Sequence, residues 1–248
     1  MKIPAKGYGL VELMVAMAIG LIVVLGVTQI FISAKNTFMS QNASSVMQED
    51  ARYVLSRMVQ ELRMVGMQGC IAQGTTSFTD ASTGLSFTLA TVNPIIYTSV
   101  TSGTATTNVL TLVTGDVGAN GGTPTWTIIS DCLTSAKAYT GLATASASAG
   151  ELAFPIRKVI YTFANSQLST TVNGTTSVLI NGVKTFNVSF GIALAATPNT
   201  VNSYTSTPAV TDYPNIRSVR ISMVLTDPNS RVRDQTFNVV ASLRNRLL

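Results

Sequence analysis

The feature that most constrains this chain is an uncharged apolar run near its start, from Leu13 to Ala34. About twenty helical residues, each rising 1.5 Å, span the ~30 Å hydrocarbon core of a bilayer. Lys2 and Lys6 precede the run and only Lys35 follows it closely, so the positive-inside rule predicts a cytoplasmic N-terminus and an exported remainder. A secretory signal ends a shorter apolar core with a small-residue cleavage site, whereas this run continues into further helix. We therefore expect the segment to be retained as a membrane anchor.

The helical pattern persists from Lys35 to Val65, with one apolar stripe at spacings of three and four residues. Arg57 and Glu61 are spaced to pair across one turn, and Gly66 and Gly69 are expected to end the helix. Anchor and amphipathic half together make one rod of ~75 Å, whose second half is expected to pack on a sheet rather than in a coiled coil. The stripe consists of Met47, Ala51, Val54, Leu55, Met58, Leu62 and Val65.

After Cys70 the sequence changes to short alternating runs that are typical of β-strands. Asn173-Gly174 is a strong hairpin signal, and Phe186, Val188 and Phe190 share one face of a later strand. We therefore predict an α+β fold in which the long N-terminal helix packs on an antiparallel sheet with one buried face. Strands are expected at 85–92, 108–115, 125–130, 158–163, 168–172, 178–192, 216–225 and from 236 onward.

The composition argues against an enzyme. Histidine is absent, which removes the commonest general base and metal ligand, and the 11 carboxylates form no close pair in a catalytic frame. The sequence contains no phosphate-binding loop. Asp116 and Asn120 could belong to a calcium loop, but the regular alternation of oxygen ligands is missing there. We expect no cofactor and no metal. Nucleic-acid binding is disfavoured, because the C-terminal arginines fit solvated strand positions better than a basic patch.

The chain has two cysteines, Cys70 and Cys132. In an oxidising compartment two cysteines indicate one disulfide. The bridge would join the helix end to the middle of the chain and contribute ~4 kcal/mol on the loop-entropy estimate. The alternative is a pair of separate buried thiols.

The segment GYGLVE, from Gly7 to Glu12, resembles the processing site of type IV prepilins. The resemblance implies cleavage after Gly7 and methylation of the new N-terminal amine on Tyr8. Glu12 is then the fifth residue after the cut, where its carboxylate pairs with the amine of a neighbouring subunit in a fibre. The alternative for Glu12 is a position among the lipid headgroups. The sequence departs from the family in having Tyr8 instead of the commoner Phe and no proline between Pro4 and Pro94.

Three further segments, Leu55–Cys70, Val178–Ile192 and Val239–Leu248, resemble the PilW family of type IV pilus minor pilins. The resemblance implies a leader peptide at 1–7, a transmembrane helix at 8–34, an amphipathic helix at 35–69 and a β-rich periplasmic domain at 70–248. It also implies a single-pass inner-membrane protein with a cytoplasmic N-terminus that later enters a surface pilus.

Such a minor pilin takes part in initiation and assembly of the filament and in its tip complex, and so in twitching motility and cell adhesion. The implied partners are other minor pilins, the major pilin, a tip adhesin, the prepilin peptidase and the inner-membrane assembly platform. Two alternatives stay open. One is a minor pseudopilin of a type II secretion system, of the J kind, and the other is a membrane-anchored periplasmic binding module that never assembles.

Overall fold

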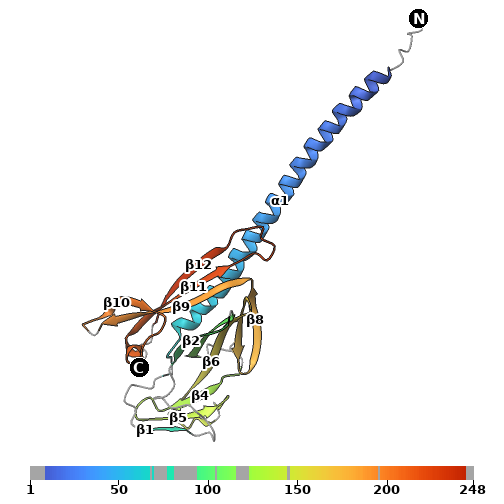
Figure 1. Ribbon diagram of the computed structural model, residues 1–248. Coiled ribbons are helices and arrows are strands. Elements are labelled where there is room, and N and C mark those ends of the chain that lie inside the picture. Colours follow the sequence, from blue (N-terminus) through green and yellow to red (C-terminus); the bar gives the residue numbers. More distant parts are fainter. Residues whose placement is uncertain are drawn as a thin grey trace.

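The structure is a computed structural model that describes residues 9–67, 69, 77–80, 94–103, 105–115, 123–143, 146–194 and 196–243. One long helix, α1 (Leu10–Arg63), projects as a rod from a β-rich domain (Figure 1). A short 3₁₀ helix, η2 (Val210–Asn215), precedes the penultimate strand. The strands are β1 (Ser77–Asp80), β2 (Ile95–Ser102), β3 (Ala105–Gly115), β4 (Trp126–Ser130), β5 (Ser135–Thr140), β6 (Leu152–Ala164), β7 (Gln167–Val172), β8 (Thr175–Asn181), β9 (Val183–Leu194), β10 (Thr197–Thr205), β11 (Ile216–Leu225) and β12 (Gln235–Ser242).

The helix runs without interruption through both predicted halves, as the continuous helical pattern requires. It ends at Arg63, so residues 64–67 and 69 of the predicted amphipathic segment lie beyond it. Gly66 and Gly69 both adopt positive φ angles, 75° and 80°, which glycine reaches without steric cost. The predicted glycine stop is confirmed, with the last helical turn slightly earlier than expected.

The strands form two sheets instead of the single sheet expected. Sheet A follows the order β1-β5-β4-β6-β3-β2, with β7 and β8 added beside β6, and sheet B follows the order β10-β9-β11-β12. Neighbouring strands are antiparallel except for β1, which pairs with β5 in parallel. The predicted α+β fold is therefore confirmed, and the predicted single sheet is wrong.

The division between the sheets falls inside the segment 178–192 that we expected to be one strand. Gly182, at φ 72°, separates β8 of sheet A from β9 of sheet B. A Cβ on Gly182 would lie 2.7 Å from the carbonyl oxygen of Thr226, so only glycine lets the two backbones approach this closely. The chain changes sheets at this close contact.

The turn at Asn173-Gly174 and most of the predicted strands are present in the structure. Asn173 and Gly174, at φ 49° and 78°, join β7 to β8 as predicted, and Asn165 and Ser166 join β6 to β7. The strands expected at 108–115, 125–130, 158–163, 168–172, 216–225 and 236 onward are present. Strands β1, β2, β5 and β10 were missed, and the strand expected at 85–92 lies outside the described residues.

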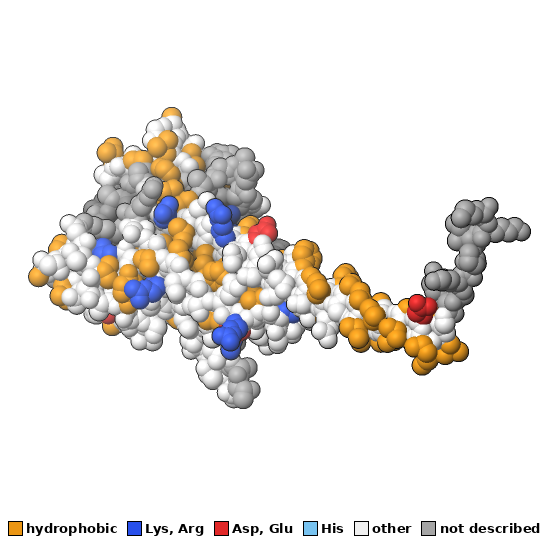
Figure 2. Space-filling view, turned by 90° about the horizontal axis from the view of Figure 1, so that it is seen from above, with side chains coloured by type: hydrophobic (Ala, Val, Ile, Leu, Met, Phe, Trp, Pro, Cys, Tyr) orange, Lys and Arg blue, Asp and Glu red, His pale blue; other side chains and the backbone are white. Residues whose placement is uncertain are grey.

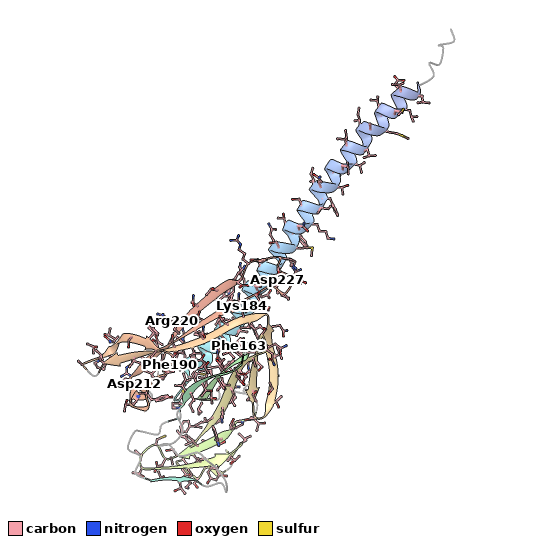
Figure 3. The ribbon with its side chains drawn as sticks, viewed as in Figure 1. Phe163, Lys184, Phe190, Asp212, Arg220 and Asp227 are labelled. Carbon is pink, nitrogen blue, oxygen red and sulfur yellow. The ribbon has the colours of Figure 1, made fainter. Side chains whose placement is uncertain are left out.

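The main hydrophobic core lies between the second half of α1 and both sheets. All seven residues of the predicted stripe are buried, and α1 contacts β11 and β12 of sheet B and β3 and β8 of sheet A. Phe186, Val188 and Phe190 of β9 face this core, as expected from their alternation. Figure 3 labels Phe163 of sheet A and Phe190 of sheet B, which both belong to this core. The predicted packing of the helix on a sheet is confirmed and extended to two sheets.

A buried polar residue connects the two sheets. Asn108 of β3 accepts a hydrogen bond from Ser99 Oγ (2.6 Å) and donates one to the backbone carbonyl of Phe186 in β9. Since its amide has partners on both sides, burying it avoids the cost of an unsatisfied polar group.

A buried ion pair fixes the last turn of α1 to sheet A. Glu61 Oε1 lies 3.0 Å from Arg157 Nη2 of β6, and its Oε2 accepts a hydrogen bond from Thr114 Oγ1 at 3.3 Å. Both side chains are largely buried, at 7% and 13% exposure. The carboxylate faces the sheet, so its ion pair is with Arg157, whereas Arg57, the predicted partner, has only an electrostatic interaction with Glu61. Burial and the negative charge of Glu61 together raise the pKa of the neighbouring Tyr161 hydroxyl.

Candidate assembly site

The first half of α1 exposes apolar side chains along its whole length. Of the described helices, α1 alone is long and apolar enough to cross a membrane, and its most apolar window has a mean hydropathy of 2.7 with none of it buried. Figure 2 shows orange apolar side chains along the rod, beyond the β domain. Apolar surface on this scale is not stable in water and marks contact with lipid or other protein. The most exposed of these side chains are Leu10, Val11, Met17, Ile22, Ile30 and Phe31.

Glu12 lies in the first turn of this exposed half. Its Oε2 accepts a hydrogen bond from the backbone N–H of Gly9 at 3.3 Å, which satisfies one of the free donors at the helix start. The negative charge also interacts favourably with the positive end of the helix dipole. Glu12 borders a shallow hollow on the helix surface together with Val15, Ala16 and Ile19. Among the described residues it forms no ion pair.

The predicted processing residues Gly7 and Tyr8 lie outside the described residues. The structure places Glu12 near the start of the rod, and α1 begins at Leu10. Glu12 therefore sits at the end of the rod that is farthest from the β domain (Figure 1).

Cys132 occupies a tightly braced turn between β4 and β5. The Oδ1 atom of Asp131 accepts hydrogen bonds from the backbone N–H groups of Leu133, Thr134 and Ser135, at 2.9 to 3.0 Å. These donors hold the pKa of Asp131 well below its usual range. Cys132 itself has φ 60°, which is uncommon outside glycine. The capping role of Asp131 was not predicted from the sequence, although an Asp before a polar turn is a recognised signal.

The other predicted cysteine, Cys70, lies outside the described residues, so its pairing with Cys132 stays a prediction. The preceding residue, Gly69, packs so closely on the ring of Phe154 that a Cβ there would overlap it. Phe154 is the register partner of Ile128 in β4, the strand that leads to Cys132. The chain just before Cys70 thus lies against β6, the strand beside β4, and β4 leads into the turn that carries Cys132.

Two segments of the chain match known protein-family models. Residues 4–28 match the prokaryotic N-terminal methylation motif, and residues 155–244 match the type IV pilus assembly protein W family, PilW. The chain carries both signatures of a PilW-family pilin. The resemblance expected from the sequence is therefore confirmed. No curated protein and no solved structure is significantly similar to the chain.

The two matches cover different parts of the pilin. The methylation motif includes Gly7, Tyr8 and Glu12 and most of the exposed half of α1. The PilW match runs from β6 to the end of β12, and so takes in all of sheet B and its junction with sheet A. The pilin therefore joins a membrane-anchoring N-terminal segment to a pilus-assembly domain, and it interacts with other components of the pilus.

The described charged side chains include four ion pairs within the pilin domain. Within the described part of the chain, no group of three metal-ligating side chains is found, and the residues of the calcium alternative, Asp116 and Asn120, lie outside it. Pilin-family domains are structural rather than enzymatic. Besides Glu61–Arg157, the ion pairs among the described residues connect Lys137 to Glu151, Lys184 to Asp234 and Arg231 to Asp227.

Proposed function

We propose that this pilin is a minor pilin that initiates assembly of the type IV pilus and belongs to the complex at its tip. The observation that carries the proposal is the exposed apolar half of α1, which has an acidic residue in its first turn and contacts no other described part of the chain. Such a surface needs a bilayer before assembly and the helices of other subunits afterwards. The PilW match favours a low-copy assembly subunit over the bulk subunit of the filament.

The proposed route begins in the inner membrane, with the N-terminus in the cytoplasm and the β domain in the periplasm. The prepilin peptidase cuts after Gly7 and methylates the amine of Tyr8, and the inner-membrane assembly platform then moves the subunit into the filament. There Glu12 pairs with the positive amine of a neighbouring subunit, so that neither charge is left alone among apolar side chains. The neighbours are other minor pilins, the major pilin and a tip adhesin, and the resulting pilus supports twitching motility and adhesion.

Mass spectrometry of the N-terminus tests the processing step. We expect a mature chain that starts at methylated Tyr8, because the methylation motif spans this site. An intact Met1 in protein taken from the native membrane would instead support an anchored module that never assembles. The same result would remove the amine that Glu12 is proposed to meet.

Replacing Glu12 by alanine tests the assembly step. Glu12→Ala leaves the neighbour's amine unpaired in apolar surroundings, so we expect incorporation into sheared pili to fall about tenfold or more. The β domain does not contact Glu12, so folding and membrane insertion should be unchanged. The matched control is Glu49→Ala, which removes an exposed carboxylate from the packed half of the same helix. Normal piliation in Glu12→Ala would show that the carboxylate is dispensable.

A deletion strain separates the pilus from the secretion alternative. If the protein is a pilus subunit, its deletion should abolish twitching and leave secretion intact. If it is a type II pseudopilin, its deletion should abolish secretion and leave twitching intact. The PilW match favours the first outcome.

We also propose that Cys70 and Cys132 form a disulfide, supported by the packing of Gly69 on the strand beside β4. On the loop-entropy estimate the bridge contributes ~4 kcal/mol. Cys70→Ser and Cys132→Ser should then lower the unfolding temperature equally, and the double variant no further than either one. Unequal and additive effects would indicate two separate thiols. Peptide mapping under non-reducing conditions gives an independent check.

A further inference from the structure

One end of the β domain faces along α1 toward the exposed half of the helix. It is formed by the loop between β11 and β12, residues 226–234, together with the junction between β8 and β9 (Figure 1). The Thr226 N–H donates to the carbonyl of Gly182 at 2.8 Å, which joins the two segments. Gln235, directly after the loop, donates through Nε2 to Ser44 Oγ of α1 at 2.8 Å. We call this end of the domain the helix-proximal end.

The helix-proximal end lies close to the expected membrane surface. The apolar run ends at Ala34, and Ala43, nine residues farther along, is the first buried residue of α1. Nine helical residues rise ~13 Å, and the headgroup layer of one leaflet accounts for about 5–7 Å of that distance. The remaining gap is within the reach of an extended arginine or lysine side chain, which can snorkel toward the headgroups.

The charges at this end are predominantly positive. Three cations, on Lys184, Arg231 and Arg233, share this end with two carboxylates, on Asp227 and Asp234, and Lys35 follows the apolar run on α1. The carboxylates already have partners: Asp227 accepts from Arg231 through both oxygens at 2.9 Å, and Asp234 lies 2.6 Å from Lys184 Nζ. Figure 3 shows Asp227 and Lys184 near the point where the helix enters the domain.

Arg233 is the cation best placed to bind something outside the chain. Arg233 is exposed to solvent, and its guanidinium forms no ion pair with any described residue. The carboxylates of Glu49 and Asp50, which could attract it, lie more than one helical turn beyond Ala43, farther from the membrane. The Asp227–Arg231 bridge braces the first part of the loop that carries Arg233.

We propose that the helix-proximal end binds the anionic headgroups of the membrane that holds α1, with Arg233 as the principal contact and Lys35 as the second. Its place beside the membrane-embedded helix and its charge both favour this occupant over a second protein. The contact orients the β domain before assembly and is lost when the helix leaves the bilayer. The inference rests on the membrane-anchor part of the proposed function.

The test uses the full chain in lipid nanodiscs that contain a photoactivatable anionic headgroup lipid. We expect mass spectrometry to find the probe on peptides from 226–234, with about fivefold less labelling in Arg233→Ser. Zwitterionic probe lipid or high salt should lower the labelling of the wild-type loop in the same way. The matched control is Lys158→Ser, which removes an exposed cation from β6 and should leave the labelling unchanged.

Three outcomes would overturn the inference. In the first, the loop is not labelled at all. In the second, neither Arg233→Ser nor a change of lipid charge alters the labelling. In the third, a second copy shields the loop, and chain–chain crosslinks replace the lipid adducts. An apolar probe in the bilayer core separates this failure from failure of the anchor, since it must label residues 13–34 if α1 spans the membrane. Labelled helix peptides with an unlabelled loop would refute the lipid contact alone.

Discussion

The two halves of α1 share one continuous helix but have opposite surroundings. From Leu10 to Ile32 its large apolar side chains are exposed, whereas from Ala43 to Leu62 its apolar stripe is buried against two sheets. No break or kink separates the halves, because both keep the helical period and no proline interrupts them. The difference lies in which side chains find a partner inside the chain.

This contrast shows how a pilin divides its work along one rod. The second half gains its stability from contacts made within the domain, so it fixes the orientation of the sheets. The first half has no such contacts and depends on lipid or on other subunits. Substitutions in the second half should therefore change folding, and substitutions in the first half should change assembly.

The largest effect on folding is expected from the buried ion pair at the end of α1. Glu61→Ala leaves the guanidinium of Arg157 without its carboxylate in a largely buried site, at an expected cost of about 3–5 kcal/mol in unfolding free energy. Denaturant unfolding of the full chain in detergent measures this loss.

Two further variants test whether the loss arises from burial. The double variant Glu61→Leu with Arg157→Met removes both charges and should regain most of the stability. Lys184→Ala breaks the exposed pair with Asp234, where the side chains are 59% and 37% exposed, and should cost less than about 1 kcal/mol. Equal losses in Glu61→Ala and Lys184→Ala would contradict the assignment of Glu61 to the core.

A pair of apolar substitutions tests the two halves directly. Met58 is fully buried, so Met58→Ala should lower the unfolding free energy of the β domain by about 2–5 kcal/mol. Ile22 is 69% exposed, and Ile22→Ala should leave that free energy unchanged. Chemical unfolding followed through the β domain compares them under the same conditions. A destabilised domain in Ile22→Ala would mean that the first half also packs on the chain.

The sequence predicted the helix and its buried stripe because both are local. Apolar residues at spacings of three and four define the face, and Gly66 limits the length, without reference to the rest of the fold. The Asn173-Gly174 hairpin was predictable for the same reason, since that dipeptide favours two consecutive positive φ angles.

The division into two sheets depends on contacts between distant segments. Gly182 follows Asn181 in what reads as another turn signal within a long strand, and its role appears only when the Thr226 carbonyl lies against it. Likewise Glu61 has a suitable cation four residues away in the sequence, yet Arg157 becomes its partner because the last helical turn packs on β6. A spacing rule cannot choose between a local and a distant cation when the carboxylate becomes buried.

The smallest expected effect concerns the loop that marks the boundary between the two halves. The guanidinium of Arg231 and the backbone N–H groups of Arg231 and Asn229 donate to Asp227, and they hold the pKa of its carboxyl well below the usual range. A carboxyl with a lowered folded-state pKa stabilises the fold above its unfolded pKa of about 4, and this stabilisation is lost as the pH falls through the folded-state pKa. The hydrogen-exchange protection of the Arg231 amide should therefore fall as the pH is lowered below about 4.

Asp227→Asn should show low protection at every pH, whereas Asp131→Asn, which alters a similar turn at the far end of sheet A, should leave the loop unchanged. If protection of the Arg231 amide stays constant down to about pH 2, or if Asp227→Asn keeps wild-type protection, the boundary of the packed half does not depend on this carboxylate.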